Sequence, residues 1–194
     1  MRKFQAGSIT DLSTQNKITK DRWKQKALEM CIFSMLGALM FCSKIIMEVL
    51  PNIHLLGMLT MAVTLTFRGK GLVPIYIYVF LNGLFVGFNV WWIPYLYIWT
   101  LLWGVTMLLP KSMPVWFKYI VYPVVCSLHG FLFGILYAPA EALFFGLNFQ
   151  ETIAWIAAGS LFDTVHGVSN FIVGFLIVPF TDLLVNLSKK AKII

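Results

Sequence analysis

The chain has 194 residues, of which 59% are hydrophobic and 12% are charged. Because soluble domains carry about 25% charged residues, this composition excludes a soluble core with a single membrane anchor and indicates one integral membrane domain. The net charge of +7 does not indicate nucleic-acid binding, because basic residues in the cytoplasmic loops of a membrane protein account for the excess.

The two ends of the chain are basic and polar. Residues 1–26 form a leader with seven of the 15 Lys and Arg residues, and this leader lacks the apolar stretch of a cleavable signal peptide. Residues 184–194 form a tail with three lysines. The expected membrane domain, residues 27–183, lies between them.

Hydropathy divides the membrane domain into six apolar segments. A transmembrane helix needs about 20 apolar residues, and somewhat fewer where the bilayer thins locally. We therefore predict an all-α integral membrane protein with six transmembrane helices, over about 27–49, 53–67, 72–90, 95–109, 119–136 and 152–179. A longer loop is expected at 138–150, where mixed aromatic and acidic residues suit either a lid over a ligand or a short interfacial helix.

Lys and Arg residues between the two ends of the chain occur mainly in alternate loops. Arg68 and Lys70 follow the second predicted helix, and Lys111 and Lys118 follow the fourth. Short loops rich in Lys and Arg stay in the cytoplasm during insertion, so both termini are expected to be cytoplasmic. The exception is Lys44, which falls inside an apolar segment.

Lys44 and Glu48 lie four residues apart, on one face near the outer end of the first predicted helix. At this spacing an ion pair lowers the cost of each charge in the membrane. Intramembrane charges are also candidates for function. The sequence leaves two interpretations: a structural pair, or a site where Lys44 binds an anionic ligand group that Glu48 orients.

Aromatic residues are concentrated around the start of the fourth predicted helix. Trp and Tyr anchor helices at the membrane interface, but aromatic rings at a concave outer mouth can also line a pocket. At helical spacing the rings cannot all face lipid. Both interpretations apply to Trp91, Trp92, Tyr95, Tyr97, Trp99 and Trp103.

The last predicted helix carries a stripe of polar and small residues, formed by Asp163, His166, Asn170 and Gly174. Spacings of three and four place them on one face, which must face the bundle because lipid would leave the polar groups unpaired. The fifth predicted helix adds His129. Hydrogen bonding between these helices and direct ligand contact both fit the pattern, whereas the spacing alone does not indicate a metal site.

Small residues recur every four positions on the first predicted helix, at Ser34, Ala38 and Cys42. Such a stripe lets another helix approach closely, either within the bundle or on a separate membrane protein.

The chain resembles the S components of energy-coupling factor (ECF) transporters. The resemblance depends on this stripe, the six predicted helices, the cytoplasmic termini and the segment 43–109. S components are the substrate-capture subunits through which prokaryotes take up vitamins and other micronutrients. The family motif on the first helix is Ala-x-x-x-Ala, and Ser34, Ala38 and Cys42 occupy that pattern here. The resemblance implies an S-component-like bundle in the plasma membrane of a prokaryote.

The resemblance also implies a mechanism. An S component binds its ligand near the outer surface, docks onto a T component with two ABC ATPases, and is thought to topple in the membrane to deliver the ligand. Because the sequence has no Gly-x-x-x-x-Gly-Lys-Ser/Thr phosphate loop, we expect ATP hydrolysis in the partners and no cofactor in this chain. Pantothenate, cobalamin, a pteridine and a modified purine are candidate ligands.

The expected capture site lies at the outer ends of the helices, where lipid exposure of polar groups would be costly. It is bounded by Lys44, Asn89, Trp92, Tyr95 and His129, with Asp163 at its floor. Two other classes of protein remain open. One is an intramembrane enzyme that uses Asp163 with His129, and the other is a structural or assembly subunit.

Overall fold

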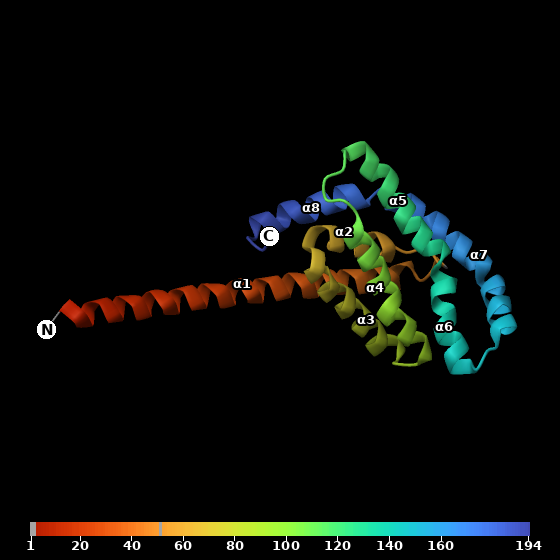
Figure 1. Cartoon of the computed structure of the whole chain (residues 1–194), viewed down its shortest axis with the longest axis horizontal. Coiled ribbons are helices and arrows are strands. Elements are labelled where there is room, and N and C mark those ends of the chain that lie inside the picture. Colours follow the sequence, from red (N-terminus) through yellow and green to blue (C-terminus); the bar gives the residue numbers. More distant parts are fainter. Residues whose placement is uncertain (1–2, 51) are drawn as a thin grey trace.

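The structure is a computed structural model that describes residues 3–50 and 52–194, and this part of the chain is helical without any strand. Figure 1 shows the arrangement of the eight α-helices. Their bounds are α1 Lys3–Met47, α2 Leu56–Phe67, α3 Leu72–Val86, α4 Ile93–Leu108, α5 Val115–Phe131, α6 Phe133–Phe145, α7 Phe149–Gly174 and α8 Ile177–Lys190. Two 3₁₀ turns, Arg68–Gly71 and Val90–Trp92, precede α3 and α4.

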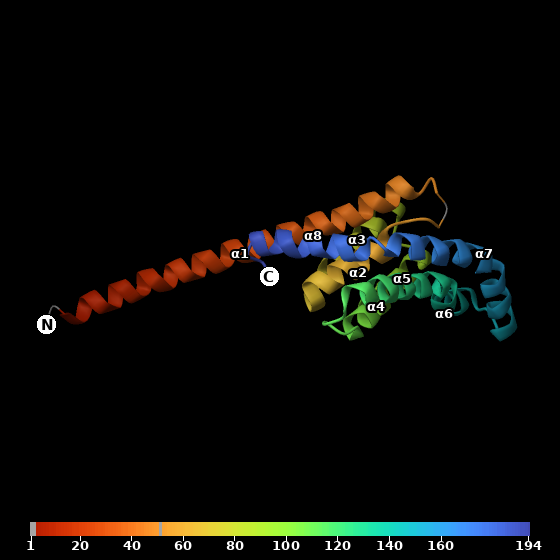
Figure 2. The same ribbon diagram turned by 90° about the horizontal axis from the view of Figure 1, so that it is seen from above.

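Helix α1 combines the predicted leader and the first predicted span in one helix of 45 residues. Its N-terminal part projects from the bundle as a straight rod (Figures 1 and 2). Its C-terminal part packs on α3 at Gly37, where a Cβ atom would lie 2.5 Å from Cγ2 of Ile77. The missing side chain therefore permits the close contact between α1 and α3.

Helix α2 occupies the centre of the bundle. Eleven of its 12 residues are buried, and a helix that is apolar on all sides is stable only inside a protein or a membrane. Its neighbours include α4 and α8. At 1.5 Å per residue α2 is about 18 Å long, which is shorter than the hydrocarbon core of a bilayer.

Among the described residues, three helical stretches are long and apolar enough to cross a membrane: Thr19–Met47, Leu56–Val86 and Val115–Phe145. A fourth results if α7 and α8, which meet at a bend of 53°, count as one span. Each of the six predicted segments is mainly helical, but length and composition thus indicate three or four spans. These helices are compatible with a multi-pass membrane protein.

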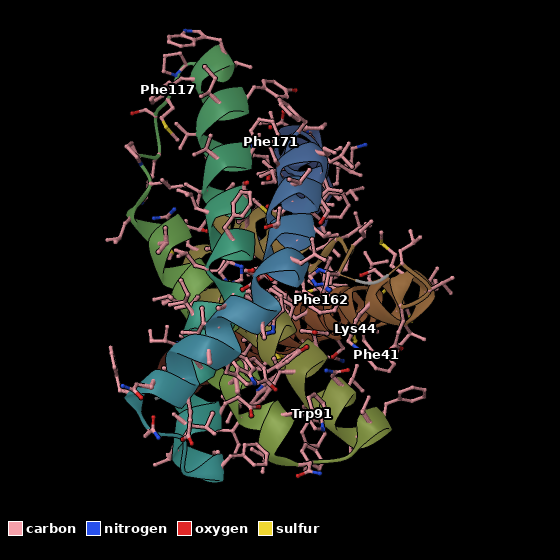
Figure 3. All side chains as sticks on the ribbon, turned by 90° about the vertical axis from the view of Figure 1, so that its right-hand side faces the viewer. Phe41, Lys44, Trp91, Phe117, Phe162 and Phe171 are labelled. Carbon is pink, nitrogen blue, oxygen red and sulfur yellow. The ribbon has the colours of Figure 1, made fainter. Side chains whose placement is uncertain are left out.

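The outer surface of the α5–α7 pair is apolar. Phe117 on α5 and Phe162 and Phe171 on α7 are exposed on this pair (Figure 3). Large exposed apolar surfaces are unusual on soluble monomers, and here they cover helices that form part of the candidate membrane spans. This surface therefore suits contact with lipid.

The predicted loop at 138–150 is mostly helix. Helix α6 continues through Pro139 to Phe145, and only a short turn separates it from α7. Gly146 adopts the left-handed conformation at φ 68°, and Asn148 then caps α7 in a capping box with Glu151. A proline inside a helix does not have to end it, because the removal of one hydrogen bond can be offset by packing.

The last predicted helix also ends differently. The structure breaks it after Gly174 and starts α8 at Ile177, so that Pro179 falls in the first turn of the new helix. Proline is tolerated there because the first N–H groups of a helix have no intrahelical partner. Helix α8 then runs to Lys190 and includes the first part of the predicted tail.

The basic segments gather at one end of the bundle. The Nζ atom of Lys70 pairs with Glu29 of α1, and the Gln25 side chain donates a hydrogen bond of 2.6 Å to the carbonyl of Lys192. The guanidinium of Arg68 donates to the carbonyl of Met107, near the end of α4. The leader, the turn before α3 and the tail therefore meet on one side.

Candidate functional site

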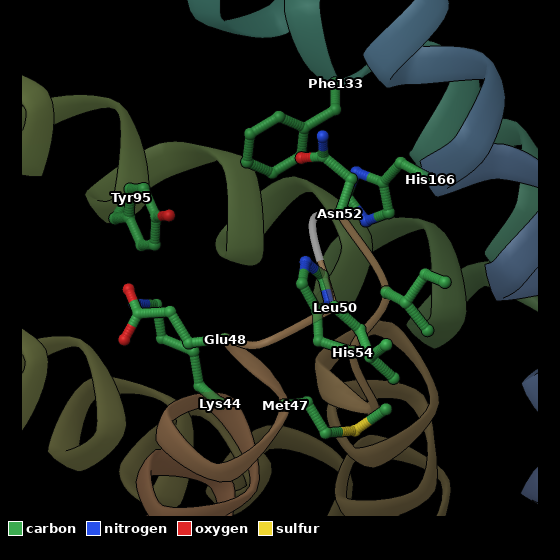
Figure 4. A pocket seen from close by; sticks show the side chains of 10 residues that line it. Lys44, Met47, Glu48, Leu50, Asn52, His54, Tyr95, Phe133 and His166 are labelled. Carbon is green, nitrogen blue, oxygen red and sulfur yellow. The ribbon is translucent and has the colours of Figure 1, made fainter.

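A cavity of about 260 Å³ lies where the end of α1 and the α1–α2 loop face α4, α6 and α7 (Figure 4). Along α1, Lys44 is 18 residues from Lys26, or about 27 Å, so the cavity is far from the basic end. The residues that line it are Lys44, Met47, Glu48, Leu50, Asn52, Ile53, His54, Tyr95, Phe133 and His166.

The α1–α2 loop is held against α7. Asn52 adopts a left-handed conformation at φ 59°, which asparagine tolerates better than most residues. Its carbonyl accepts a hydrogen bond of 3.3 Å from the hydroxyl of Ser169 on α7. This contact places His54, two residues later, beside α7.

The rim of the cavity carries opposite charges. The Nζ atom of Lys44 lies 3.5 Å from Oε1 of Glu48, and their side chains are 17% and 61% exposed. A lysine four residues before a glutamate is the less favourable order on a helix, and exposed pairs contribute only about 0.2–1 kcal/mol. The pair is therefore weak, and the Lys44 ammonium can exchange Glu48 for an anionic ligand group at little cost.

Two of the three histidines, His54 and His166, line the cavity, and the third, His129, lies behind them in the same cluster of rings. The rings of His54 and His166 are in edge contact, with centroids 4.6 Å apart. Phe133 lies 5.0 Å from His166 and 6.0 Å from His129, centroid to centroid. Trp99 completes the cluster at 5.5 Å from His129. The α1–α2 loop and the helices α4, α5, α6 and α7 each contribute one ring to this cluster.

Several polar atoms in this cluster lack partners. Nδ1 of His54, Nδ1 of His129, Nε2 of His166 and Nε1 of Trp99 are buried without a hydrogen-bond partner among the described residues. Leaving one buried polar group unpaired costs about 1–3 kcal/mol. Of these four residues, His54 and His166 line the cavity, so a ligand in the cavity could supply the partners that their ring nitrogens lack.

His54 lies in the loop, outside the membrane-spanning helices. Burial of its ring lowers the pKa of His54 to about 4, so the ring is neutral at pH 7. A neutral imidazole offers one donor and one acceptor. It therefore suits a ligand with both a hydrogen-bond donor and an acceptor better than it suits a fixed anion.

The described residues contain no group of three or more His, Cys, Asp or Glu side chains arranged to hold a metal ion. One nitrogen of His129 is already engaged, because its Nε2 lies 3.3 Å from the carbonyl of Ile98.

Of the six residues predicted to contact the ligand, Lys44 and Tyr95 line the cavity. His129 lies behind this wall, against Trp99. The carboxylate of Asp163 accepts hydrogen bonds of 3.1 and 3.2 Å from the backbone N–H of Gly134. Asp163 therefore stabilises the first turn of α6, at its positive end.

Asn89 and Trp92 were also predicted as ligand contacts. In the structure they form hydrogen bonds that stabilise the turn between α3 and α4. The Asn89 side chain accepts a hydrogen bond from the N–H of Val90. The indole Nε1 of Trp92 donates a bond of 2.8 Å to the carbonyl of Val79, and its ring contacts Phe88 edge-on. Neither residue is among those that line the cavity.

The lining also contains residues that the sequence prediction did not place in the capture site, above all His54, His166 and Phe133. The chain has three histidines. Their scarcity in an apolar sequence was the one signal that could have indicated His54 and His166 as candidate site residues. Phe133 is one of 17 phenylalanines, so composition did not distinguish it.

The small-residue stripe on α1 and the neighbouring Gly37 lie on different faces of the helix. Gly37 is buried against α3, whereas Ser34 and Cys42 are exposed and Ala38 is half-buried. The Ser34–Ala38–Cys42 stripe therefore faces away from the core and is accessible to another protein.

The α5–α7 contact accounts for part of the polar stripe on α7. The hydroxyl of Ser127 donates a 2.9 Å bond to the carbonyl of Gly167, and the Asn170 amide donates to the carbonyl of Cys126. These residues connect two helices, whereas His166 on the same stripe faces the cavity. The interpretation as helix–helix hydrogen bonding thus applies to Asn170, and ligand contact by His166 stays a prediction.

Comparison of the chain with protein-family models, curated proteins and solved structures gave no match. The functional argument therefore depends on the sequence and on the geometry of the site.

Proposed function

We propose that this protein is the substrate-capture (S) subunit of an ECF-type ABC transporter and that it binds a vitamin or related micronutrient in the Lys44–His166 cavity. The main support is one observation. The cavity is lined by the Lys44 ammonium and by two residues, His54 and His166, that each have a buried ring nitrogen without a partner among the described residues. A ligand that satisfies these atoms would gain affinity from groups that are costly in the empty site.

The proposed topology has six transmembrane helices and two cytoplasmic termini. The basic segments meet at one end of the bundle, and the positive-inside rule assigns that end to the cytoplasm. The cavity then opens toward the outside. Helices α2, α3 and α4, with 12, 15 and 16 residues, cross where the bilayer thins around the protein.

The proposed partners are a T component and two ABC ATPases. The outward Ser34–Ala38–Cys42 stripe supports this proposal, because small residues let a partner helix approach closely. ATP hydrolysis is assigned to the ATPases, since this sequence has no phosphate loop. The membrane is the plasma membrane of a prokaryote, as the resemblance to S components implies.

The lining favours a small ligand with an apolar ring and one anionic group. Phe133 and Tyr95 offer aromatic walls, His54 and His166 offer donors and acceptors, and Lys44 suits a carboxylate or phosphate. A volume of about 260 Å³ favours pantothenate, a pteridine or a modified purine over cobalamin, which is several times larger.

Purification from the native membrane tests this function. We expect the chain to copurify with ABC ATPases, and native mass spectrometry should detect a bound small molecule that survives mild detergent. A protein that purifies alone, without a small molecule and with hydrolytic activity, would instead indicate an intramembrane enzyme. The engagement of Asp163 by the N–H of Gly134 favours binding over catalysis. Copurification without any bound small molecule would indicate a structural subunit.

A further inference from the structure

A second hollow, of about 310 Å³, lies at the basic end of the bundle. Four cationic side chains line it, from Arg22, Lys26, Lys70 and Lys192. Glu29 is the one acid among its lining residues and is already paired with Lys70. The hollow therefore has a formal excess of three positive charges and suits an anion.

Tertiary contacts hold this hollow together. The Gln25 side chain donates a 2.6 Å hydrogen bond to the carbonyl of Lys192, and the N–H of Ile193 donates to the carbonyl of Ser188. Lys192 itself adopts a left-handed conformation at φ 57°. The cations thus come from α1, the turn before α3 and the end of the chain, and folding is what brings them together.

An apolar groove of about 500 Å³ begins directly beside this hollow and runs between α1 and α8. Its walls include Met35 and Leu39 of α1 and Leu184 and Leu187 of α8. On α1 the groove begins at Ile32, one turn after Glu29. At the other wall, Ala191 of the groove is followed in the chain by Lys192 of the hollow, so the basic hollow and the apolar groove adjoin each other.

The basic hollow and the apolar groove together fit the dimensions of one leaflet of a bilayer. Trp23 is 67% exposed, as expected for an aromatic anchor at the membrane interface, and the apolar part of α1 begins just after Lys26. From Ile32 to Leu39 the helix rises about 10 Å. This length fits within the half-thickness of the hydrocarbon core, about 15 Å.

We propose that an anionic phospholipid of the cytoplasmic leaflet binds here, with its phosphate headgroup on Arg22, Lys26 and Lys192 and one acyl chain in the α1–α8 groove. An anionic group joined to an apolar chain complements both hollows at once. Free phosphate would leave the groove unfilled, and an apolar helix of a partner would leave the cations without counter-ions. The inference depends on the chain being embedded in a membrane, and it is independent of ligand capture at the other end.

Native mass spectrometry of the full chain, released from bilayers of phosphatidylglycerol and phosphatidylcholine in equal amounts, tests the headgroup. We expect phosphatidylglycerol to be retained preferentially. Lys26→Gln with Lys192→Gln removes two of the three cations proposed to bind the phosphate directly, and should lower this preference at least about tenfold. The matched control is Lys189→Gln with Lys190→Gln, which removes the same charge outside the hollow and should retain the preference.

A second pair of variants tests the acyl chain. Ala191→Trp adds a bulky ring to the groove wall and should weaken retention of phosphatidylglycerol, whereas Ala158→Trp on the exposed surface of α7 should not. Circular dichroism and thermal unfolding verify folding. The proposal is overturned if the original protein retains the two lipids equally, or if both pairs of lysine substitutions lower the preference for phosphatidylglycerol equally. It is also overturned if the Ala191→Trp variant retains phosphatidylglycerol as well as the original protein does. If Ala191→Trp abolishes only the copurification of another membrane protein, that protein occupies the groove and the proposal is also wrong.

Discussion

The ring of His54 lies edge-on to the ring of His166, with their centroids 4.6 Å apart. This contact joins the α1–α2 loop to the middle of α7, and a buried nitrogen on each ring lacks a partner among the described residues. A ligand that hydrogen-bonds to either ring would therefore also restrain the loop.

The first prediction compares His166→Phe with His129→Phe. Nε2 of His166 has no partner in the described part of the chain, so phenylalanine should leave the free energy of unfolding within about 1 kcal/mol of the original value. The bound small molecule should nevertheless be lost from native mass spectra. His129→Phe removes the contact with the Ile98 carbonyl and should lower stability by about 1 kcal/mol. Retention of the small molecule by a folded His166→Phe protein would place the ligand elsewhere.

The second prediction concerns the charged rim. A hydrogen bond to a charged group contributes about 1.5–3 kcal/mol, so Lys44→Met should lower the affinity for an anionic ligand at least about tenfold. Glu48→Gln should keep or raise this affinity, because it removes the competing carboxylate 3.5 Å from Nζ. Equilibrium binding of anionic and neutral analogues is the measurement. Equal losses for both analogues in Lys44→Met would show that the lysine acts on the fold.

The third prediction compares two neighbouring positions on α1. A Cβ atom at Gly37 would lie 2.5 Å from Ile77, so Gly37→Leu should lower the free energy of unfolding by about 1–3 kcal/mol through overpacking. Ala38→Leu points into the outward stripe and should leave thermal stability and ligand binding unchanged. It should prevent assembly with the T component, as measured by copurification. Normal assembly of Ala38→Leu would mean that the stripe is not the docking face.

The fourth prediction concerns Trp92, which the sequence suggested as a stacking partner of the ligand. Because its indole donates to the carbonyl of Val79, Trp92→Phe should lower stability by about 1 kcal/mol without a change in ligand affinity. Thermal unfolding and equilibrium binding measure the two effects separately. A stable variant with about 1–3 kcal/mol weaker binding, the range expected of a central contact, would support the stacking role instead.

Much of the fold is visible in the sequence because hydropathy and charge act locally. Apolar segments predicted a helical membrane protein, which is the coarse result that the helices support. Helix ends were less predictable. The sequence prediction placed a loop around Pro139 and a helix end at Pro179. In the structure, Pro139 lies inside α6 and Pro179 lies in the first turn of α8, so both prolines are accommodated within helices.

The sequence by itself determined which residues are unusual in an apolar chain: Lys44 within a span, three histidines, and basic residues in four places. The tertiary structure alone decided which of them meet. Asp163 and Trp92 each form a hydrogen bond with the backbone of a neighbouring helix. His54 and His166 instead contact each other, although they come from distant parts of the chain. The physical reason is that hydropathy is a property of each residue, but whether a polar side chain has a partner depends on the groups that folding places beside it.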